Sequence, residues 1–156
     1  MALVELLLSP LPSHVRTARL VAVAAARRAG LDDERVDELR LAVGEACSRA
    51  VGLHARHATD VPVRLTVADD VSGLTLTVAD AGPAAGPVPD DPAQGMLADE
   101  PHPDLDGLGD PDVALAVLHG LVDDVTVNTE PGATVVTMRW PLPTGAGPRT
   151  TIVAQR

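Results

Sequence analysis

The order of periodic segments along the 156-residue chain constrains its fold more than any other feature of the sequence. Two adjacent segments carry apolar residues at helical spacing, one over residues 13 to about 28 and one over residues 32 or 33 to about 53. Ser13 is a suitable N-cap for the first helix, and Gly30 is a suitable stop after it. The carboxylates of Asp32 and Asp33, near which the second helix should begin, suit its positive end. The sequence therefore predicts two consecutive helices in its first third.

Strand-like segments surround these helices. They are Val4–Leu8, Pro62–Ala68, Leu74–Ala79, Val125–Asn128 and Thr134–Trp140. The second and third are joined through Asp69–Gly73, and the last two flank Glu130–Ala133, and both connections are typical of hairpins. A further short helix is expected at Val113–Leu121. This order predicts an α/β two-layer sandwich, with a mostly antiparallel sheet and its helices on one face.

Composition narrows the classes of function. The 12 Lys+Arg and 22 Asp+Glu give a net charge of −10, and binding to nucleic-acid phosphates needs clustered cations, so no nucleic-acid partner is expected. Because there is no Phe or Tyr and only one Trp, the core must consist of Leu, Val and Ala. The single Cys47 excludes an intramolecular disulfide, and the apolar run Ala2–Leu8 is too short to cross a membrane. We expect a cytoplasmic protein without a membrane partner.

Charge is distributed unevenly along the predicted domain. Residues 1–141 form one domain without internal repeats, and residues 142–156 are expected to be a flexible tail. Residues 1–64 hold nine arginines and eight acidic residues, whereas residues 65–138 hold 14 acidic residues and no arginine. Within that acidic part, residues 83–112 carry eight acidic residues and seven of the 14 prolines. This composition predicts an irregular loop.

Five short boxes occur in order on these predicted elements. They are Ala18-Arg19-Leu20, Glu45-Ala46-Cys47-Ser48-Arg49, Val78-Ala79-Asp80-Ala81-Gly82, Gly107-Leu108-Gly109 followed by Leu121–Val125, and Pro131-Gly132-Ala133-Thr134. With these boxes, roughly residues 4–141 resemble the small serine kinases that act as bacterial anti-sigma factors, of the RsbW and SpoIIAB type. These belong to the GHKL (histidine-kinase-like) ATPase superfamily. The resemblance implies the GHKL, or Bergerat, ATPase fold.

The resemblance also implies a nucleotide site. Asp80 would accept a hydrogen bond from the adenine amino group, and Gly82 would let the ring approach the backbone. Gly107 and Gly109 would offer backbone amides to the phosphates, and Thr134 belongs to the box at the final hairpin turn. On the residues alone, the Asp80 box is equally an ordinary signal for a strand that ends in a turn.

Around this site the sequence departs from the family pattern. Pro83 and Ala84 alter the rim of the adenine pocket, because proline lacks a backbone donor and the family has glycine at the second position. The acidic segment 83–112 occupies the place of the ATP lid, where its carboxylates would repel a triphosphate. Asp110 or Asp112 is alternatively a cap for the helix that follows.

Glu45 and Arg49 decide what chemistry is expected. In the resembling kinases the residue at Glu45 is the general base that deprotonates a serine of the partner. An ordinary helix carboxylate that pairs with Arg49 one turn later is the structural alternative. Where the family has an Mg²⁺-ligating Asn, this chain has Arg49, which has five donors and no acceptor and cannot ligate a metal ion. We therefore expect a degenerate ATP/Mg²⁺ site and no bound cofactor.

No other group of residues predicts a metal or a nucleophile. His54 and His57 are three residues apart, and Cys47 lies seven residues before His54, but no further ligand has the spacing of a metal site. We expect both histidines at the surface or at a helix end. Cys47 is expected to be a small core residue.

The sequence thus favours an anti-sigma-factor-like regulator that acts by protein binding rather than as an enzyme. Its expected partners are an anti-anti-sigma factor with a STAS domain, a sigma factor, or both, and the resembling proteins often form homodimers. Arg16 and Arg19 on the first helix are the expected partner-binding residues, because family members present the arginine matched by Arg19 to their partners. An active ATP-dependent serine kinase that uses Glu45 is the alternative, and a scaffold without a sigma partner is a third.

Overall fold

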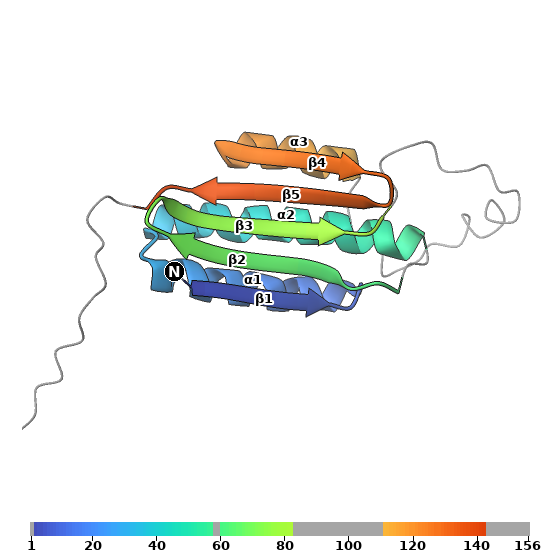
Figure 1. Cartoon of the computed structure of the whole chain (residues 1–156), viewed down its shortest axis with the longest axis horizontal. Helices are drawn as coiled ribbons and strands as arrows, with labels where there is room; N and C mark the ends of the chain where they lie inside the picture. The colour runs from blue at the N-terminus through green and yellow to red at the C-terminus, as the bar shows by residue number, and fades with distance from the viewer. Residues whose placement is uncertain (1, 58–59, 83–110, 143–156) are drawn as a thin grey trace, which may run out of the picture.

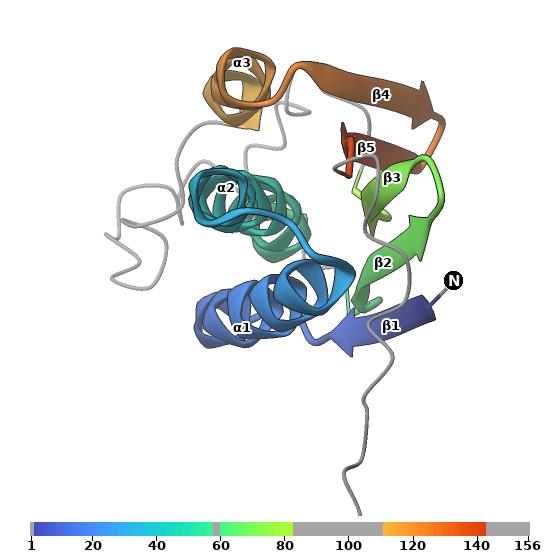
Figure 2. The same ribbon diagram turned by 90° about the vertical axis from the view of Figure 1, so that its left-hand side faces the viewer.

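A five-stranded antiparallel sheet forms one layer of the molecule, and three helices cover one of its faces (Figures 1 and 2). The computed structural model describes residues 2–57, 60–82 and 111–142. The strand order is β1-β2-β3-β5-β4, and every neighbouring pair is antiparallel. The predicted two-layer sandwich is confirmed.

The first two helices lie next to each other across the sheet. Helix α1 spans Pro12–Ala29 and ends at Gly30, whose φ of 95° is left-handed. Leu11 is its N-cap, without a side-chain hydrogen bond, so the prediction that Ser13 caps this helix is wrong. Proline at the first helical position is favourable there, since it has no N–H to satisfy, and it starts the helix one residue before Ser13.

Helix α2 spans Asp33–Arg56 and is the longest element. It begins where predicted, near Asp32 and Asp33. Asp32 is its N-cap, and the Asp32 carboxylate accepts a hydrogen bond of 2.9 Å from the backbone N–H of Arg35. The helix ends three residues later than predicted, at Arg56. It contacts both α1 and α3 (Figure 2), so it is the central helix of its layer.

The strands follow the predicted order with slightly longer bounds. They are β1 (Ala2–Leu8), β2 (Val63–Asp70), β3 (Gly73–Asp80), β4 (Asp124–Glu130) and β5 (Ala133–Trp140). Both predicted hairpins are present, and Gly132 supplies a φ of 77° in the second turn. Helix α3 spans Pro111–Leu121, so Asp112 lies within it and does not cap it from outside. The predicted lid, including Gly107, Gly109 and Asp110, lies outside the described residues, as does the tail from residue 143.

The core lies between the two layers and consists mainly of aliphatic side chains, as the composition predicted. Trp140 is its largest member and is 1% exposed. Its indole N–H donates to the Glu38 carboxylate at 2.8 Å, which satisfies the one polar group of this side chain. In the described ranges, no helix is both long enough and apolar enough to cross a membrane.

Cys47 provides a test of this core. The residue is fully buried on α2, and burial raises the pKa of its thiol to about 12. Because only the thiolate reacts readily, the folded protein should react with a disulfide reagent far more slowly than the urea-unfolded protein at neutral pH. Labelling kinetics followed by thiolate release measure this difference. Equal rates in the two states would contradict the packing of α2 against the sheet.

Candidate functional site

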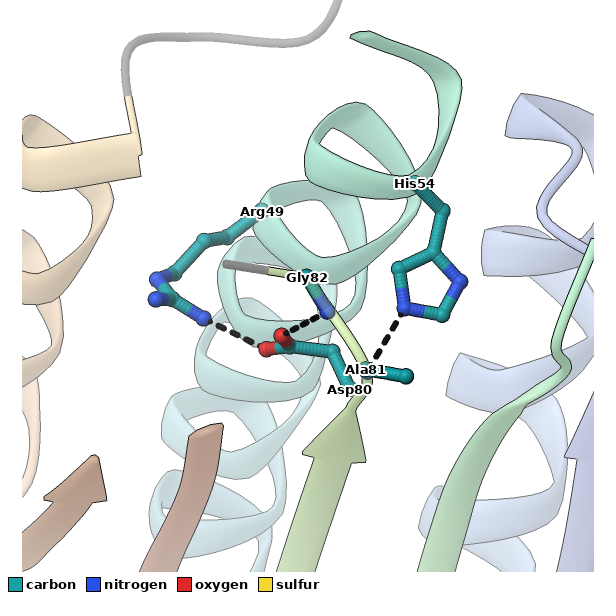
Figure 3. Close-up of polar contacts among 5 residues, drawn as sticks. All are labelled: Arg49, His54, Asp80, Ala81 and Gly82. Carbon is teal, nitrogen blue, oxygen red and sulfur yellow. Dashed lines mark hydrogen bonds and ion pairs between the residues drawn. The ribbon is translucent and has the colours of Figure 1, made fainter. Parts of the chain in front are cut away.

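The carboxyl end of β3 brings together residues from three separate parts of the chain. Asp80 closes the strand and pairs with Thr134 across the β3–β5 ladder. Arg49 comes from the inward face of α2, and Gly82 follows β3 (Figure 3). The structure therefore brings the predicted Asp80, Gly82 and Thr134 together, and adds Arg49 to them.

A buried ion pair joins Arg49 to Asp80. The Arg49 Nη1 and Asp80 Oδ2 atoms are 2.8 Å apart, and the two side chains are 3% and 0% exposed (Figure 3). Within the described ranges Arg49 forms no ion pair with Glu45, so the alternative in which these two residues pair one turn apart is wrong. The reason is burial: α2 turns Arg49 towards the sheet, where an unpaired guanidinium would be very costly, while Glu45 remains half-exposed.

Both oxygens of Asp80 are engaged. Oδ2 accepts from Arg49, and Oδ1 accepts a 3.0 Å hydrogen bond from the backbone N–H of Gly82. A Cβ added at Gly82 would lie 3.1 Å from the Leu53 Cβ and 3.2 Å from Asp80 Oδ1. The missing side chain at Gly82 thus lets the backbone pass close to α2 and bond to Asp80.

His54 holds the same segment from the other side. It is fully buried, and its Nδ1 lies 2.8 Å from the carbonyl oxygen of Val61. Its Nε2 accepts a 2.9 Å hydrogen bond from the backbone N–H of Ala81 (Figure 3). Because a carbonyl can only accept, these partners place the proton on Nδ1. His54 lies in the last turn of α2, at the predicted helix end, but it is buried and not at the surface.

Two buried polar atoms of this site lack a hydrogen-bond partner among the residues that the structure describes. They are the Nε of Arg49 and the Oγ1 of Thr134. Arg49 therefore uses one of its nitrogens on Asp80 while another stays unused. Buried polar atoms without partners are uncommon in proteins, and they mark this end of the sheet as the most unusual polar environment in the described structure.

The other predicted site residues that the structure describes lie on the helices. Arg16 and Arg19 are exposed on α1, and Glu45 is half-exposed on α2. The described residues contain no group of three or more side chains suited to holding a metal ion.

Two arginines of α2 allow a matched test of the buried ion pair. Arg40 pairs with Asp37 at 2.9 Å, but those side chains are 46% and 68% exposed. Replacing Arg49 by Ala leaves Asp80 buried without its cation and should cost about 3–5 kcal/mol of unfolding free energy. Replacing Arg40 by Ala should cost about 0.5 kcal/mol or less. Urea unfolding monitored by Trp140 fluorescence measures the free energy of unfolding of both variants. Equal decreases would show that the buried pair stabilises the protein no more than the exposed pair does.

Comparison with known proteins places this geometry in a family. The sequence matches the Histidine kinase-like ATPase domain over residues 8–140. It is 32% identical over 127 residues to the Serine-protein kinase RsbW of Bacillus licheniformis, covering 80% of this chain and 76% of the relative. It is 29% identical over 140 residues to the Serine-protein kinase RsbW of Bacillus subtilis (strain 168), covering 88% of this chain and 84% of the relative.

A solved structure shows the same fold. The crystal structure of the RsbU and RsbW domains of Rv1364c from Mycobacterium tuberculosis superimposes with a TM-score of 0.63 at 17% identity. The match covers 91% of this chain and 32% of that longer chain. Since the family match spans most of the sequence, this chain belongs to the histidine kinase-like ATPase domain family and is a relative of the RsbW serine-protein kinases.

Proposed function

We propose that this chain is a cytoplasmic, anti-sigma-factor-like regulator that acts by protein binding and has lost or weakened its nucleotide chemistry. Its proposed partners are an anti-anti-sigma factor with a STAS domain, a sigma factor, or both in turn. The relationship to RsbW proteins supports a regulator of this kind. The observation that carries the loss of nucleotide chemistry is the buried ion pair between Arg49 and Asp80.

The residues present do not fit Mg²⁺. A magnesium ion requires oxygen ligands in octahedral geometry, and the helix position that resembles the family's Asn ligand holds the guanidinium of Arg49. A guanidinium has no acceptor atom and keeps its positive charge. Asp80, the adjacent carboxylate, is already neutralised by Arg49.

The residues present do not fit adenine either. Asp80 is the proposed acceptor for the adenine amino group, but its side chain is fully buried, and its two oxygens already accept hydrogen bonds from Arg49 and the Gly82 amide. For a base to bind in the family manner, the Arg49 side chain would have to leave a position in which it is 3% exposed. Among the described side chains of the proposed set, Thr134 has a buried hydroxyl oxygen, Oγ1, without a hydrogen-bond partner.

Without phosphoryl transfer, regulation would rest on competition between partners. Arg16 and Arg19 give α1 an exposed basic face that suits an acidic protein surface. Two proteins that bind this face exclude each other, so their relative affinities and concentrations decide which is held. A second kinase that modifies the STAS partner would shift this balance from outside.

Nucleotide binding separates this proposal from an active serine kinase that uses Glu45. Calorimetric titration of the wild-type chain with ATP and Mg²⁺ should detect no micromolar binding, because Arg49 both replaces the metal ligand and covers Asp80. A micromolar dissociation constant that depends on Mg²⁺ would overturn the proposal.

Arg49→Asn tests whether this one residue blocks the site. Asparagine supplies a carbonyl oxygen and frees Asp80, so Mg·ATP should raise the melting temperature of this variant and leave that of the wild type unchanged. Arg40→Asn, on the exposed side of the same helix, is the matched control and should not respond. A variant that ignores Mg·ATP would show that other departures, such as the altered rim, also block the site.

Partner capture tests the regulatory role. Arg19→Glu reverses the charge of an exposed α1 residue and should abolish capture of the STAS protein or sigma factor, while the circular dichroism spectrum stays unchanged. Arg27→Glu changes the same charge on the last turn of the same helix and should retain capture. Undiminished capture by Arg19→Glu would remove Arg19 from the binding surface.

A further inference from the structure

Gly44 of α2 lies directly beneath the guanidinium group of Arg19 from α1. A Cβ added at Gly44 would lie 2.5 Å from the Nε and 2.7 Å from the Cζ of Arg19, and would also collide with Nη2. Real side chains do not approach this closely, so the flat face of the guanidinium rests against a helix surface that only glycine leaves open.

The positive charge of Arg19 lies near α2 and has no carboxylate partner among the described residues. Burial raises the pKa of the Cys47 thiol, and the charge of Arg19 partly opposes this effect. The Arg19 charge therefore lies close to Cys47, which is one turn after Gly44 on α2. In the part of the chain that the structure describes, Arg19 forms no ion pair, although its side chain is exposed. A guanidinium that is held in place and has unused donors can bind a carboxylate.

Exposed leucines lie near Arg19 and Gly44 in the same two helices. Leu20 follows Arg19 on α1 and is 64% exposed, and Leu41 is 57% exposed. Leu41 lies three residues before Gly44, so both belong to one face of α2. An exposed charge on helices that also expose large apolar side chains is typical of a protein-binding surface rather than of a small-ion site.

We propose that Gly44 is a positioning residue that holds the Arg19 guanidinium to receive a carboxylate from a protein partner, with Leu20 and Leu41 contacting apolar side chains beside that carboxylate. This inference rests on the proposed function, because it concerns the same α1 surface. It adds a residue on α2 that the family boxes do not assign to binding, and it states the partner's chemistry: an acidic side chain with apolar neighbours.

Gly44→Ala tests the proposal, because alanine adds only the atom that the geometry excludes. Alanine favours a helix interior more than glycine does, and the displaced group is the end of a flexible side chain, so the melting temperature should not fall. Affinity for the STAS protein or sigma factor that binds the wild-type chain should fall about tenfold or more, because Arg19 can no longer take its position.

Gly120→Ala is the matched control. Gly120 also lies in a helix, and a Cβ added there meets no heavy atom within 4 Å. It should therefore change the affinity by less than about twofold, as expected for a helix-propensity change alone. Equal weakening by both alanine variants would overturn the role of Gly44.

A double-mutant cycle shows whether Gly44 acts through Arg19. In an Arg19→Ala background, adding Gly44→Ala should cause less than about a twofold further loss, because the group that it displaces is already gone. Additive losses would overturn the mechanism. Binding that survives Gly44→Ala overturns only this inference, whereas a wild-type chain that binds neither protein overturns the proposed function and the docking role with it.

The position of Arg19 can also be measured without a partner. The NMR signal of its Nε–Hε group, assigned with Arg19→Lys, should shift in Gly44→Ala and not in Gly120→Ala. An unchanged Arg19 signal in Gly44→Ala would overturn the claim that Gly44 positions this side chain.

Discussion

The buried pair of Arg49 and Asp80 governs the end of the sheet on which a nucleotide site would be built. Each side chain is nearly inaccessible to water, so burying either charge without the other would be strongly destabilising. The pair also ties α2 to β3 at the point where the chain leaves the sheet. His54, a little more than one turn after Arg49, adds a second polar link from α2 to the Asp80–Gly82 segment. Two inward-facing polar residues of one helix thus fix the backbone of the whole site.

The two sides of α2 serve different purposes in this arrangement. Its side facing the sheet supplies Arg49 and His54, which hold the Asp80–Gly82 segment from two sides. Its side facing α1 supplies the buried Gly44, over which the guanidinium of Arg19 lies. One arginine of the layer is therefore neutralised internally, and another keeps its charge available at the surface. This division of charge is what the proposed regulation by protein binding requires.

Local patterns predicted the elements well and the pairings poorly. The spacing of apolar residues predicted both long helices, the turn residues predicted both hairpins, and α2 begins near Asp32 and Asp33 as expected, because these features depend on neighbours in sequence. Arg49 pairs with Asp80, 31 residues away, whereas the sequence alone suggested Glu45, one turn away. Arg49 pairs with Asp80 because both side chains are buried in the folded protein. The burial of His54 was not predicted for the same reason, although His54 continues the buried stripe of Cys47 and Val51, which is the signal that would have placed it in the core.

Arginine in place of the family's asparagine changes the meaning of the Asp80 box. Asparagine would leave Asp80 to an external ligand, whereas arginine reaches the carboxylate and makes it part of the protein's own interior. Asp80 then has a structural reason to be present even if no nucleotide binds, since Arg49 cannot be buried without it. Gly82 has one as well, because its amide completes the hydrogen bonds of the same carboxylate. An intact Asp-x-Gly box in such a chain is therefore no sign of ATP binding until the residue that faces it from α2 is known.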